Sequence, residues 1–180
     1  MDVEPGGLAG LLLIKPKVIG DNRGFFMEGY RRDVLERAGL KADFVQDNHA
    51  RSEKAGVVRG LHFQTGEAAQ AKYVWVTAGA IFDVVVDIRP DSSSFGLWKS
   101  FILSAENKHR LFVPRGFAHG YMTLEPETEL QYKVDAYYSP SHDSGIFWKD
   151  PQLAVNWPDF PPILSDKDKR LPLLHEYFNL

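Results

Sequence analysis

A short stretch of the sequence, residues 59–64 (RGLHFQ), combines a permanent cation, an imidazole and an amide. Alternate side chains of a strand point to opposite faces, so we expect His62 and Gln64 to share a face and Arg59 to point the other way. Gly60 would leave room for a ligand beside His62. Taken alone, the stretch is better explained by a surface strand with a structural histidine, so its significance depends on other residues.

Other titratable side chains lie on separate predicted strands, namely Lys72, Asp83, His119 and Tyr132. Alternate residues of a barrel strand point inward, so these groups and His62 can converge on one cavity. A structural core residue is the commoner explanation for any single one of them. Buried ionisable groups need partners or a function, however, and their number on separate strands favours a site.

This set of groups suits proton transfer at a carbon atom. A histidine is a base near neutral pH, and a carboxylate behind it fixes its tautomer and stabilises the imidazolium. A lysine beside a carbonyl stabilises the enolate that forms, and a tyrosine across the substrate can return a proton to the opposite face. The chemistry indicated is epimerisation. Either Asp83 or Asp168 can support His62, and Asp83 can instead pair with Lys72.

Metal binding is the main competing interpretation. The sequence has no His-x-His pair, and a site of histidines and a carboxylate assembled from distant positions remains as the alternative. Without cysteine there is no thiol nucleophile, no cysteine-bound zinc and no disulfide. Neither a glycine-rich phosphate loop nor a Gly-x-Ser-x-Gly motif occurs.

The pattern of strands and turns predicts an all-β fold, an antiparallel sandwich or barrel, in one domain over residues 1–180. Residues 81–89 alternate, with apolar side chains at even positions and Asp83 on the opposite face, and in residues 129–138 Leu130 and Tyr132 share a face. The only clear early helix is residues 31–38, followed by Gly39 as its cap. The proline-rich tail from Pro151 should wrap the barrel irregularly, with one helical turn near residues 165–168.

Composition limits the possible partners. The net charge of −3 gives no support for nucleic-acid binding. The first residues lack the features of a signal peptide, and no apolar stretch has the length of a membrane span. We therefore expect a cytoplasmic protein that does not associate with membranes.

Several separated motifs, in order, give the chain a close resemblance to the dTDP-4-dehydrorhamnose 3,5-epimerases, a family of cupin-type nucleotide-sugar epimerases. The match covers roughly Leu8 to Leu171. The motifs are residues 21–28 (DNRGFFME), 46–48 (QDN), 59–64 (RGLHFQ), 71–72 (AK), 83–89 (DVVVDIR), 114–120 (PRGFAHG), 132–133 (YK), 137–138 (YY) and 164–168 (LSDKD).

The resemblance implies a cupin jelly-roll β-barrel with a few short peripheral helices, acting as a homodimer without metal or other cofactor. The substrate would be dTDP-4-dehydro-6-deoxy-D-glucose and the product dTDP-4-dehydro-L-rhamnose, a step in L-rhamnose synthesis for cell-surface polysaccharide. A relative that inverts only C3 or only C5 would have the same catalytic residues. A non-catalytic sugar-binding or metal-binding barrel is a third possibility.

The resemblance also implies residue roles. His62 would be the base, Asp168 its carboxylate partner, Tyr132 the proton donor and Lys72 the group that stabilises the enolate. Tyr138 would stack on the thymine ring, and Arg23 and Glu28 would reach across the dimer. The substrate-binding set would be Arg23, Phe26, Glu28, Gln46, Asp47, Asn48, Arg59, Lys72, His119, Tyr138, Asp143 and Lys167. Asp143 stands where the family usually has a glutamate, so that contact would differ.

Overall fold

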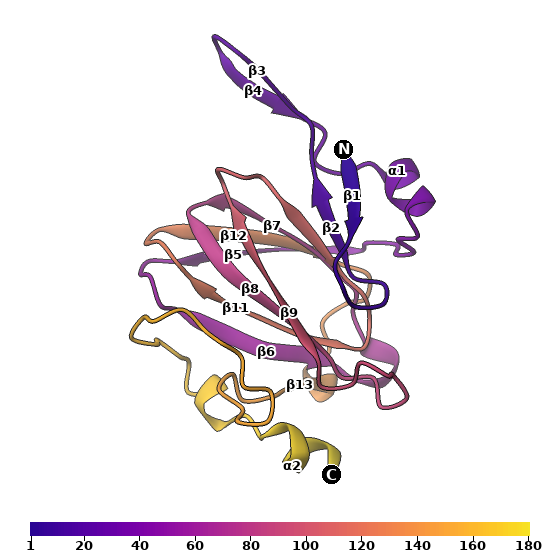
Figure 1. Cartoon of the computed structure of the whole chain (residues 1–180), viewed down its shortest axis with the longest axis vertical. Helices are drawn as coiled ribbons and strands as arrows, with labels where there is room; N and C mark the ends of the chain where they lie inside the picture. Colours follow the sequence, from indigo (N-terminus) through magenta and orange to yellow (C-terminus); the bar gives the residue numbers. More distant parts are fainter.

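The chain forms two facing β-sheets with short helices at the periphery, as a computed structural model of residues 1–180 shows (Figure 1). The strands are β1 (Asp2–Pro5), β2 (Leu12–Lys15), β3 (Val18–Asp21), β4 (Gly24–Met27), β5 (Gln46–Ser52), β6 (Val58–Gln64), β7 (Lys72–Ala78), β8 (Ala80–Asp87), β9 (Trp98–Ser104), β10 (Arg110–Val113), β11 (Phe117–Thr123), β12 (Thr128–Val134) and β13 (Asp143–Gly145). The helices are α1 (Arg32–Arg37) and α2 (Leu174–Phe178), with single 3-10 turns at Gly66–Ala68, Pro140–His142 and Asp168–Arg170.

All strand pairs in the two main sheets are antiparallel. One sheet has six strands in the order β1-β2-β10-β7-β12-β5, and the other has five in the order β13-β6-β11-β8-β9. Several strands that are consecutive in sequence, such as β6 and β7, lie in different sheets. The expected all-β jelly-roll barrel is confirmed. None of its helices has the length and apolar character needed to cross a membrane.

The space between the sheets is filled by a cluster of buried apolar side chains from both of them. Val74 and Leu130 come from the six-stranded sheet, and Ile81 and Val85 come from the five-stranded sheet. Each fully buried aliphatic side chain of this kind contributes about 1.5–3 kcal/mol through removal from water. The partly buried Tyr132 packs against the same cluster, so the core holds that ring in place.

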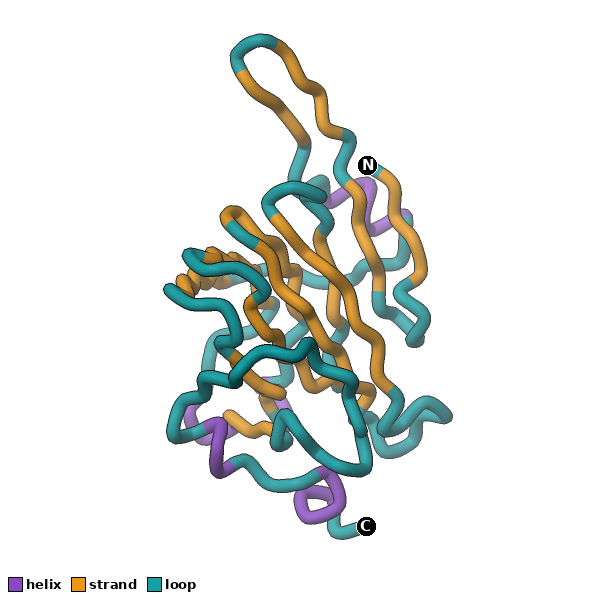
Figure 2. The backbone as a smooth tube through the Cα atoms, turned by 60° about the vertical axis from the view of Figure 1, so that its left-hand side comes forward, coloured by secondary structure: helices purple, strands orange, loops and turns teal.

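The alternation in β8 is confirmed, and the face that carries Val84 and Val86 is the outer one. Val84 and Val86 pack with Ile146, Leu153 and Leu174 of the C-terminal segment. That segment covers the five-stranded sheet mostly as loops, as the proline-rich sequence predicted (Figure 2). The opposite face of β8 looks into the barrel, where it places Asp83.

The expected helix at residues 31–38 is also confirmed, as α1 followed by Gly39 with a positive φ of 93°. The sequence did not indicate α2. This helix has only five residues, and Leu174 is its one buried side chain. A turn so short depends on packing rather than on helical periodicity.

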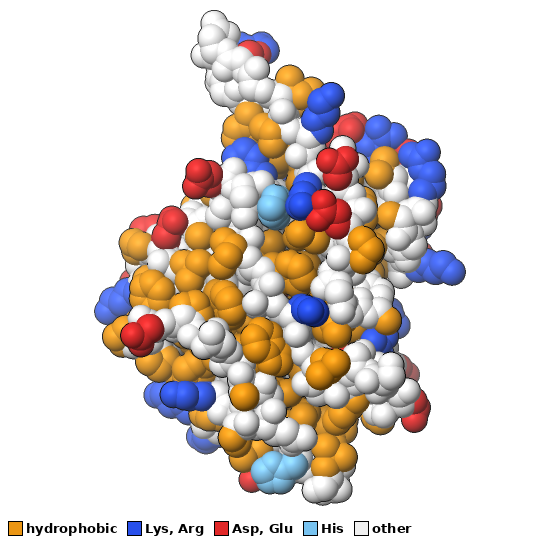
Figure 3. Space-filling view, in the orientation of Figure 1, with side chains coloured by type: hydrophobic (Ala, Val, Ile, Leu, Met, Phe, Trp, Pro, Cys, Tyr) orange, Lys and Arg blue, Asp and Glu red, His pale blue; other side chains and the backbone are white.

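Strands β3 and β4 form a separate two-stranded ribbon that projects from the barrel (Figures 1 and 2). We call residues 18–28 the arm. Its turn is closed by the Arg23 backbone N–H, which donates to the Asp21 carboxylate at 2.8 Å. The space-filling view shows the arm standing clear of the body (Figure 3).

Candidate active site

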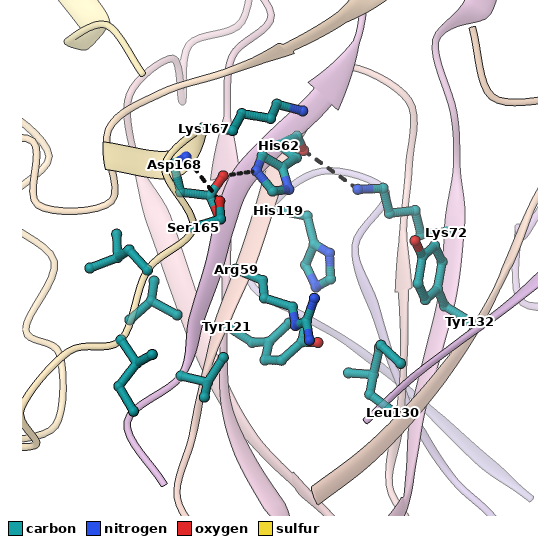
Figure 4. Close-up of a pocket in the computed structure, with 15 residues that line it drawn as sticks. Arg59, His62, Lys72, His119, Tyr121, Leu130, Tyr132, Ser165, Lys167 and Asp168 are labelled. Carbon is teal, nitrogen blue, oxygen red and sulfur yellow. Dashed lines mark hydrogen bonds and ion pairs between the residues drawn. The ribbon is translucent and has the colours of Figure 1, made fainter. Parts of the chain in front are cut away.

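A cavity of about 440 Å³ lies between the two sheets (Figure 4). The two sheets and the C-terminal segment line it. The five-stranded sheet contributes Val58, Arg59, His62, His119 and Tyr121, with Val57 just before β6, and the six-stranded sheet contributes Ala50, Lys72, Leu130 and Tyr132. The C-terminal segment contributes Ile163, Leu164, Ser165, Lys167 and Asp168. Three parts of the chain that are far apart in sequence thus form one site.

Arg59 and His62 line the same cavity, so the prediction that they point to opposite faces was wrong. In the pairing of β6 with β11, His62 lies opposite His119 and Arg59 lies opposite Tyr121, with a register shift between the two pairs. One extra residue in β6 makes a bulge there, and a bulge re-aims the side chains around it. Gly60 is required at this point, because its φ is +126° and an added Cβ would lie 2.6 Å from the Gly120 Cα.

The His62 imidazole is hydrogen-bonded to the Asp168 carboxylate, with 2.6 Å between Nε2 and Oδ1. Asp168 is only 3% exposed, and its backbone N–H donates to the Ser165 hydroxyl at 3.1 Å. Burial alone would raise the pKa of the Asp168 carboxyl, but the hydrogen bond and charge interaction with His62, together with hydrogen bonds from Gly60 and Ser165, hold that pKa below its usual range. Of the two carboxylates considered for His62, Asp168 is the one in contact.

Asp83 forms a second buried pair, with His119. The two atoms, Asp83 Oδ2 and His119 Nε2, are 2.8 Å apart, and both residues are buried. The second oxygen of Asp83 has no hydrogen-bond partner. Because Asp83 comes from β8 and His119 from β11, the pair orients the imidazole toward the cavity from two adjacent strands.

Lys72 enters the cavity from the first position of β7, in the other sheet. Its Nζ donates to the His62 backbone carbonyl at 3.4 Å. Burial lowers the pKa of the Lys72 ammonium to about 8, and the nearby Asp83 and Asp143 carboxylates only partly offset that decrease. The ammonium is therefore a cation at neutral pH that releases its proton more readily than a surface lysine does.

Tyr132 lies beside Lys72, across the cavity from His62 and Asp168 (Figure 4). It shares the inward face of β12 with Leu130, as the alternation predicted. Burial raises the pKa of its hydroxyl, an increase that the Arg59 cation partly opposes. The hydroxyl therefore keeps its proton at neutral pH, as a proton donor must.

A smaller hollow of about 200 Å³ adjoins the main cavity. The residues common to the two are His62, Lys72, Tyr132 and Lys167, and the hollow adds Phe63, Gln64, Gln70, Tyr138 and Asp143. The Tyr138 hydroxyl donates to Asp143 Oδ2 at 3.0 Å, and the Lys167 ammonium pairs with the same oxygen. An exposed aromatic ring beside a carboxylate and an ammonium can stack on a planar ring and hydrogen-bond its edge.

Two groups of predicted binding residues do not line the cavity of their own chain. Arg23 and Phe26 lie on the arm and Glu28 at its end, and the Arg23 side chain is 85% exposed. In β5, Asp47 points outward and pairs with Lys133 at 2.8 Å.

The other two residues of that β5 motif lie close to Tyr138. The Gln46 amide nitrogen donates to Asn48 Oδ1 at 2.9 Å. The Gln46 amide oxygen accepts a hydrogen bond from the Tyr138 backbone N–H at 3.2 Å. This motif therefore supports the loop that carries the exposed tyrosine.

The sequence interpretation missed Tyr121 and the apolar wall of the cavity. Tyr121 is two residues after His119 on one strand, so the alternation that pointed to His119 could have found it. Burial raises the pKa of Tyr121 to about 12. Ile163 and Leu164 of the apolar wall belong to an irregular segment. Such a segment has no alternation of apolar and polar residues from which the inward-facing side chains could be predicted.

No three His, Asp or Glu side chains lie close enough together to hold a metal ion. The expectation of a site without metal or cofactor remains a prediction. The groups that do converge are a histidine–carboxylate pair, a lysine and a tyrosine, and side chains of these types can act as general acids and bases.

Comparison with known proteins identifies relatives along the whole chain. The family model for dTDP-4-dehydrorhamnose 3,5-epimerase matches residues 6–176. The dTDP-4-dehydrorhamnose 3,5-epimerase of Escherichia coli K12 is 50% identical over 182 residues, covering 100% of this chain and 98% of the relative. A dTDP-4-dehydrorhamnose 3-epimerase of Streptomyces niveus is 36% identical, covering 98% of this chain and 85% of the relative.

Solved structures agree. The Bacillus anthracis 3,5-epimerase with TDP and PPi bound has a TM-score of 0.93 and 52% identity, covering 96% of this chain and 98% of that one. A Legionella pneumophila 3,5-epimerase in complex with dTDP-4-keto-L-rhamnose has a TM-score of 0.92 and 43% identity, covering 97% and 93%. The sequence, the two-sheet barrel and its cavity together show that the chain belongs to the dTDP-4-dehydrorhamnose 3,5-epimerase family and is an epimerase.

Proposed function

We propose that this enzyme inverts both C3 and C5 of dTDP-4-dehydro-6-deoxy-D-glucose to give dTDP-4-dehydro-L-rhamnose. One observation carries the proposal: His62 projects from the five-stranded sheet and Tyr132 from the six-stranded sheet, across a single cavity. A sugar ring lying between the sheets presents one face to the histidine and the other to the tyrosine. Removing a proton on one face and delivering one on the other inverts the carbon.

The first step is removal of a proton next to the C4 ketone. His62 takes the proton from C3 or C5, and the electron pair of the broken C–H bond forms the enolate with its charge on the C4 oxygen. Asp168 stabilises the imidazolium, and the Lys72 ammonium stabilises the enolate oxygen. The 2.6 Å hydrogen bond between Asp168 and His62 supports this role.

The second step delivers a proton to the opposite face of the same carbon. The Tyr132 hydroxyl gives up its proton as the enolate collapses to the ketone, and both side chains then exchange protons with solvent to return to their starting states. Because C3 and C5 both flank C4, the same base, acid and lysine serve each carbon in turn. The groups present supply acid–base catalysis by themselves, and we propose that neither metal nor cofactor takes part.

The nucleotide would occupy the smaller hollow and its surroundings. Tyr138 would stack on the thymine, and Asp143 with Lys167 would bind the edge of the ring. Arg59 and His119, which lie in the main cavity, would bind the diphosphate and sugar. The TDP and dTDP-4-keto-L-rhamnose bound to the solved relatives support a substrate of this class.

We further propose a homodimer in which each arm completes the partner's cavity. The arm exposes large apolar side chains that its own chain does not cover, since Ile19, Phe25 and Phe26 are 57%, 58% and 66% exposed. Exposed apolar clusters of this kind mark interaction surfaces. Docking against a second copy would bury them and bring Arg23 and Glu28 to that copy's substrate.

Proton exchange tests the reaction directly. The protein is incubated with dTDP-4-dehydro-6-deoxy-D-glucose in D2O, without metal or nicotinamide, and deuterium at C3 and C5 is followed by NMR. We expect deuterium at both carbons and, with a reductase present to trap it, the L-sugar. Absence of exchange at both carbons would refute the proposed reaction.

The alternative is an enzyme that inverts one carbon only. The similarity to a 3-epimerase favours it, because the same cavity groups suffice for a single inversion. Deuterium confined to C3 would establish that activity and exclude the double inversion.

A further inference from the structure

The arm joins the barrel through Gly29, which two side chains of the six-stranded sheet enclose. The Tyr73 hydroxyl donates to the Gly29 carbonyl at 2.8 Å. On the other side lies the Arg110 guanidinium, so close that a Cβ added to Gly29 would stand 2.7 Å from Arg110 Cζ and 2.9 Å from Nη1. Gly29 does not have a positive φ. Space for Arg110, and not backbone conformation, is therefore the reason for a glycine here.

Arg110 is an unusual cation. It is only 7% exposed, its Nε has no hydrogen-bond partner, and no carboxylate pairs with it. Its guanidinium lies over the Trp75 ring at 4.9 Å and near the Tyr73 ring at 6.0 Å. Cation–π contacts of this kind are favourable but do not replace an ion pair for a buried charge. The guanidinium is confined between the two rings and Gly29.

A second contact holds the arm itself. The Lys108 ammonium lies over the Phe25 ring at 4.3 Å. Lys108, two residues before β10, therefore contacts the arm, and Arg110, the first residue of β10, contacts its base. In the pairing of β10 with β7, Arg110 lies opposite Trp75 and Val113 opposite Lys72. The base of the arm is thus fixed to the strand that carries a cavity lysine.

From these contacts we propose that Arg110 is a positioning residue. Together with Tyr73 it clamps Gly29, and so it sets the direction in which the arm leaves the barrel. The inference rests on the proposed function, in which Arg23 and Glu28 bind the substrate of the partner subunit. Gly29 lies six residues after Arg23, which is in the turn at the tip of the hairpin. A clamp at the base matters because a small rotation there moves the tip by a larger distance.

The test uses Gly29→Ala and Arg110→Met, singly and together, in the full-length protein. Each single change disrupts the same contact, so we expect each to raise KM for the nucleotide sugar, and Kd for dTDP, by about tenfold, with kcat changed less than about threefold. The double variant should also show about a tenfold increase rather than a hundredfold one, because residues in contact are not additive. The mass of the assembly and the melting temperature are measured for every variant.

Gly20→Ala is the matched control. It lies on the same arm, and a Cβ there meets only the Gly24 carbonyl oxygen at an ordinary 3.7 Å. We expect its KM to rise less than that of Gly29→Ala, because it does not touch the clamp. Tyr73→Phe is a milder probe, because it removes one hydroxyl and keeps the ring; it should raise KM by about five- to tenfold, as expected for loss of one hydrogen bond.

Two results would overturn the proposal. If Gly29→Ala behaves like Gly20→Ala, the guanidinium moves aside freely and nothing is clamped. If the effects of Gly29→Ala and Arg110→Met multiply, they act independently. Failure of the proposed function is recognised separately, because the unaltered protein would then show no exchange at C3 or C5, whereas dTDP affinity would still report on the clamp.

Discussion

Replacement of Asp168 by asparagine isolates the role of the carboxylate behind His62. The amide has nearly the same shape and fits the buried site, but it carries no charge. The hydrogen bond that it replaces is short, 2.6 Å, and joins a carboxylate to an imidazole that must become cationic. Hydrogen bonds to charged groups contribute about 1.5–3 kcal/mol. At about 1.4 kcal/mol per factor of ten, kcat should fall about 10- to 150-fold.

The assay is the initial rate of deuterium incorporation, followed separately at C3 and C5. One base serves both carbons in the proposed mechanism, so Asp168→Asn should slow both exchanges by the same factor and leave KM nearly unchanged. Asp166→Asn is the matched control, since Asp166 lies in the same segment, is exposed and pairs only with the exposed Lys169. The reasoning is refuted if the two variants exchange at similar rates. Loss at one carbon alone would mean that each carbon has its own base.

Of four further predictions, two concern the lysine, one the arm and one the absence of metal. Because burial lowers the pKa of Lys72 to about 8, kcat/KM should decline above that pH as the cation is lost, and Lys72→Arg should move the decline to higher pH; a pH–rate profile of both proteins checks this. The pKa of Lys72 is about 8 in the folded state and 10.5 in the unfolded state, so below about pH 8 the buried charge disfavours folding. At neutral pH, Lys72→Met should therefore melt at a higher temperature than the unaltered protein. This difference in melting temperature should shrink as the pH rises from 8 to 10.5. Arg23→Ala and His62→Ala should each be inactive or impaired. After the two variants are mixed and exchange subunits, about a quarter of all cavities should combine an intact His62 with an intact arm from the partner, so activity should return. If the mixture is no more active than the separate variants, the arm serves its own chain. Treatment with a chelator should leave the rate unchanged, and activity lost to it and restored by one metal would show a metal requirement.

Regular alternation explains why much of the site could be predicted from the sequence. Lys72, His119 and Tyr132 all point into the cavity from strands with uninterrupted pairing to at least one neighbour. In such strands a period of two residues translates directly into a face of the sheet. The same rule, applied one step further along the strand of His119, would have added Tyr121.

The orientation of Arg59 could not be predicted because it depends on tertiary pairing. The bulge in β6 lies where Gly60 meets Gly120 of the neighbouring strand. A glycine inside a strand is a local sign of a bulge or of a close approach, but it does not say which of the two occurs. The partner of His62 was ambiguous for a related reason. Asp168 is 106 residues away in an irregular segment, where neither periodicity nor spacing indicates a contact. Motif resemblance pointed to Asp168, and the geometry then separated it from Asp83.

The jelly-roll connectivity also explains how His62 and Lys72, the proposed base and the proposed enolate-stabilising group, come together. His62 and Lys72 are ten residues apart, yet they belong to different sheets, because the chain crosses from β6 to β7 between them. The crossing brings the Lys72 Nζ to the His62 carbonyl, at the edge of the cavity where the sheets meet. Tyr132, from the strand paired with β7, then faces His62 from the far side. The two sheets hold these groups in place through their shared core, so in the proposed mechanism the fold determines which face of the sugar loses a proton. Substitutions within the cavity should therefore change the rate, or the number of carbons processed, but not the direction of inversion.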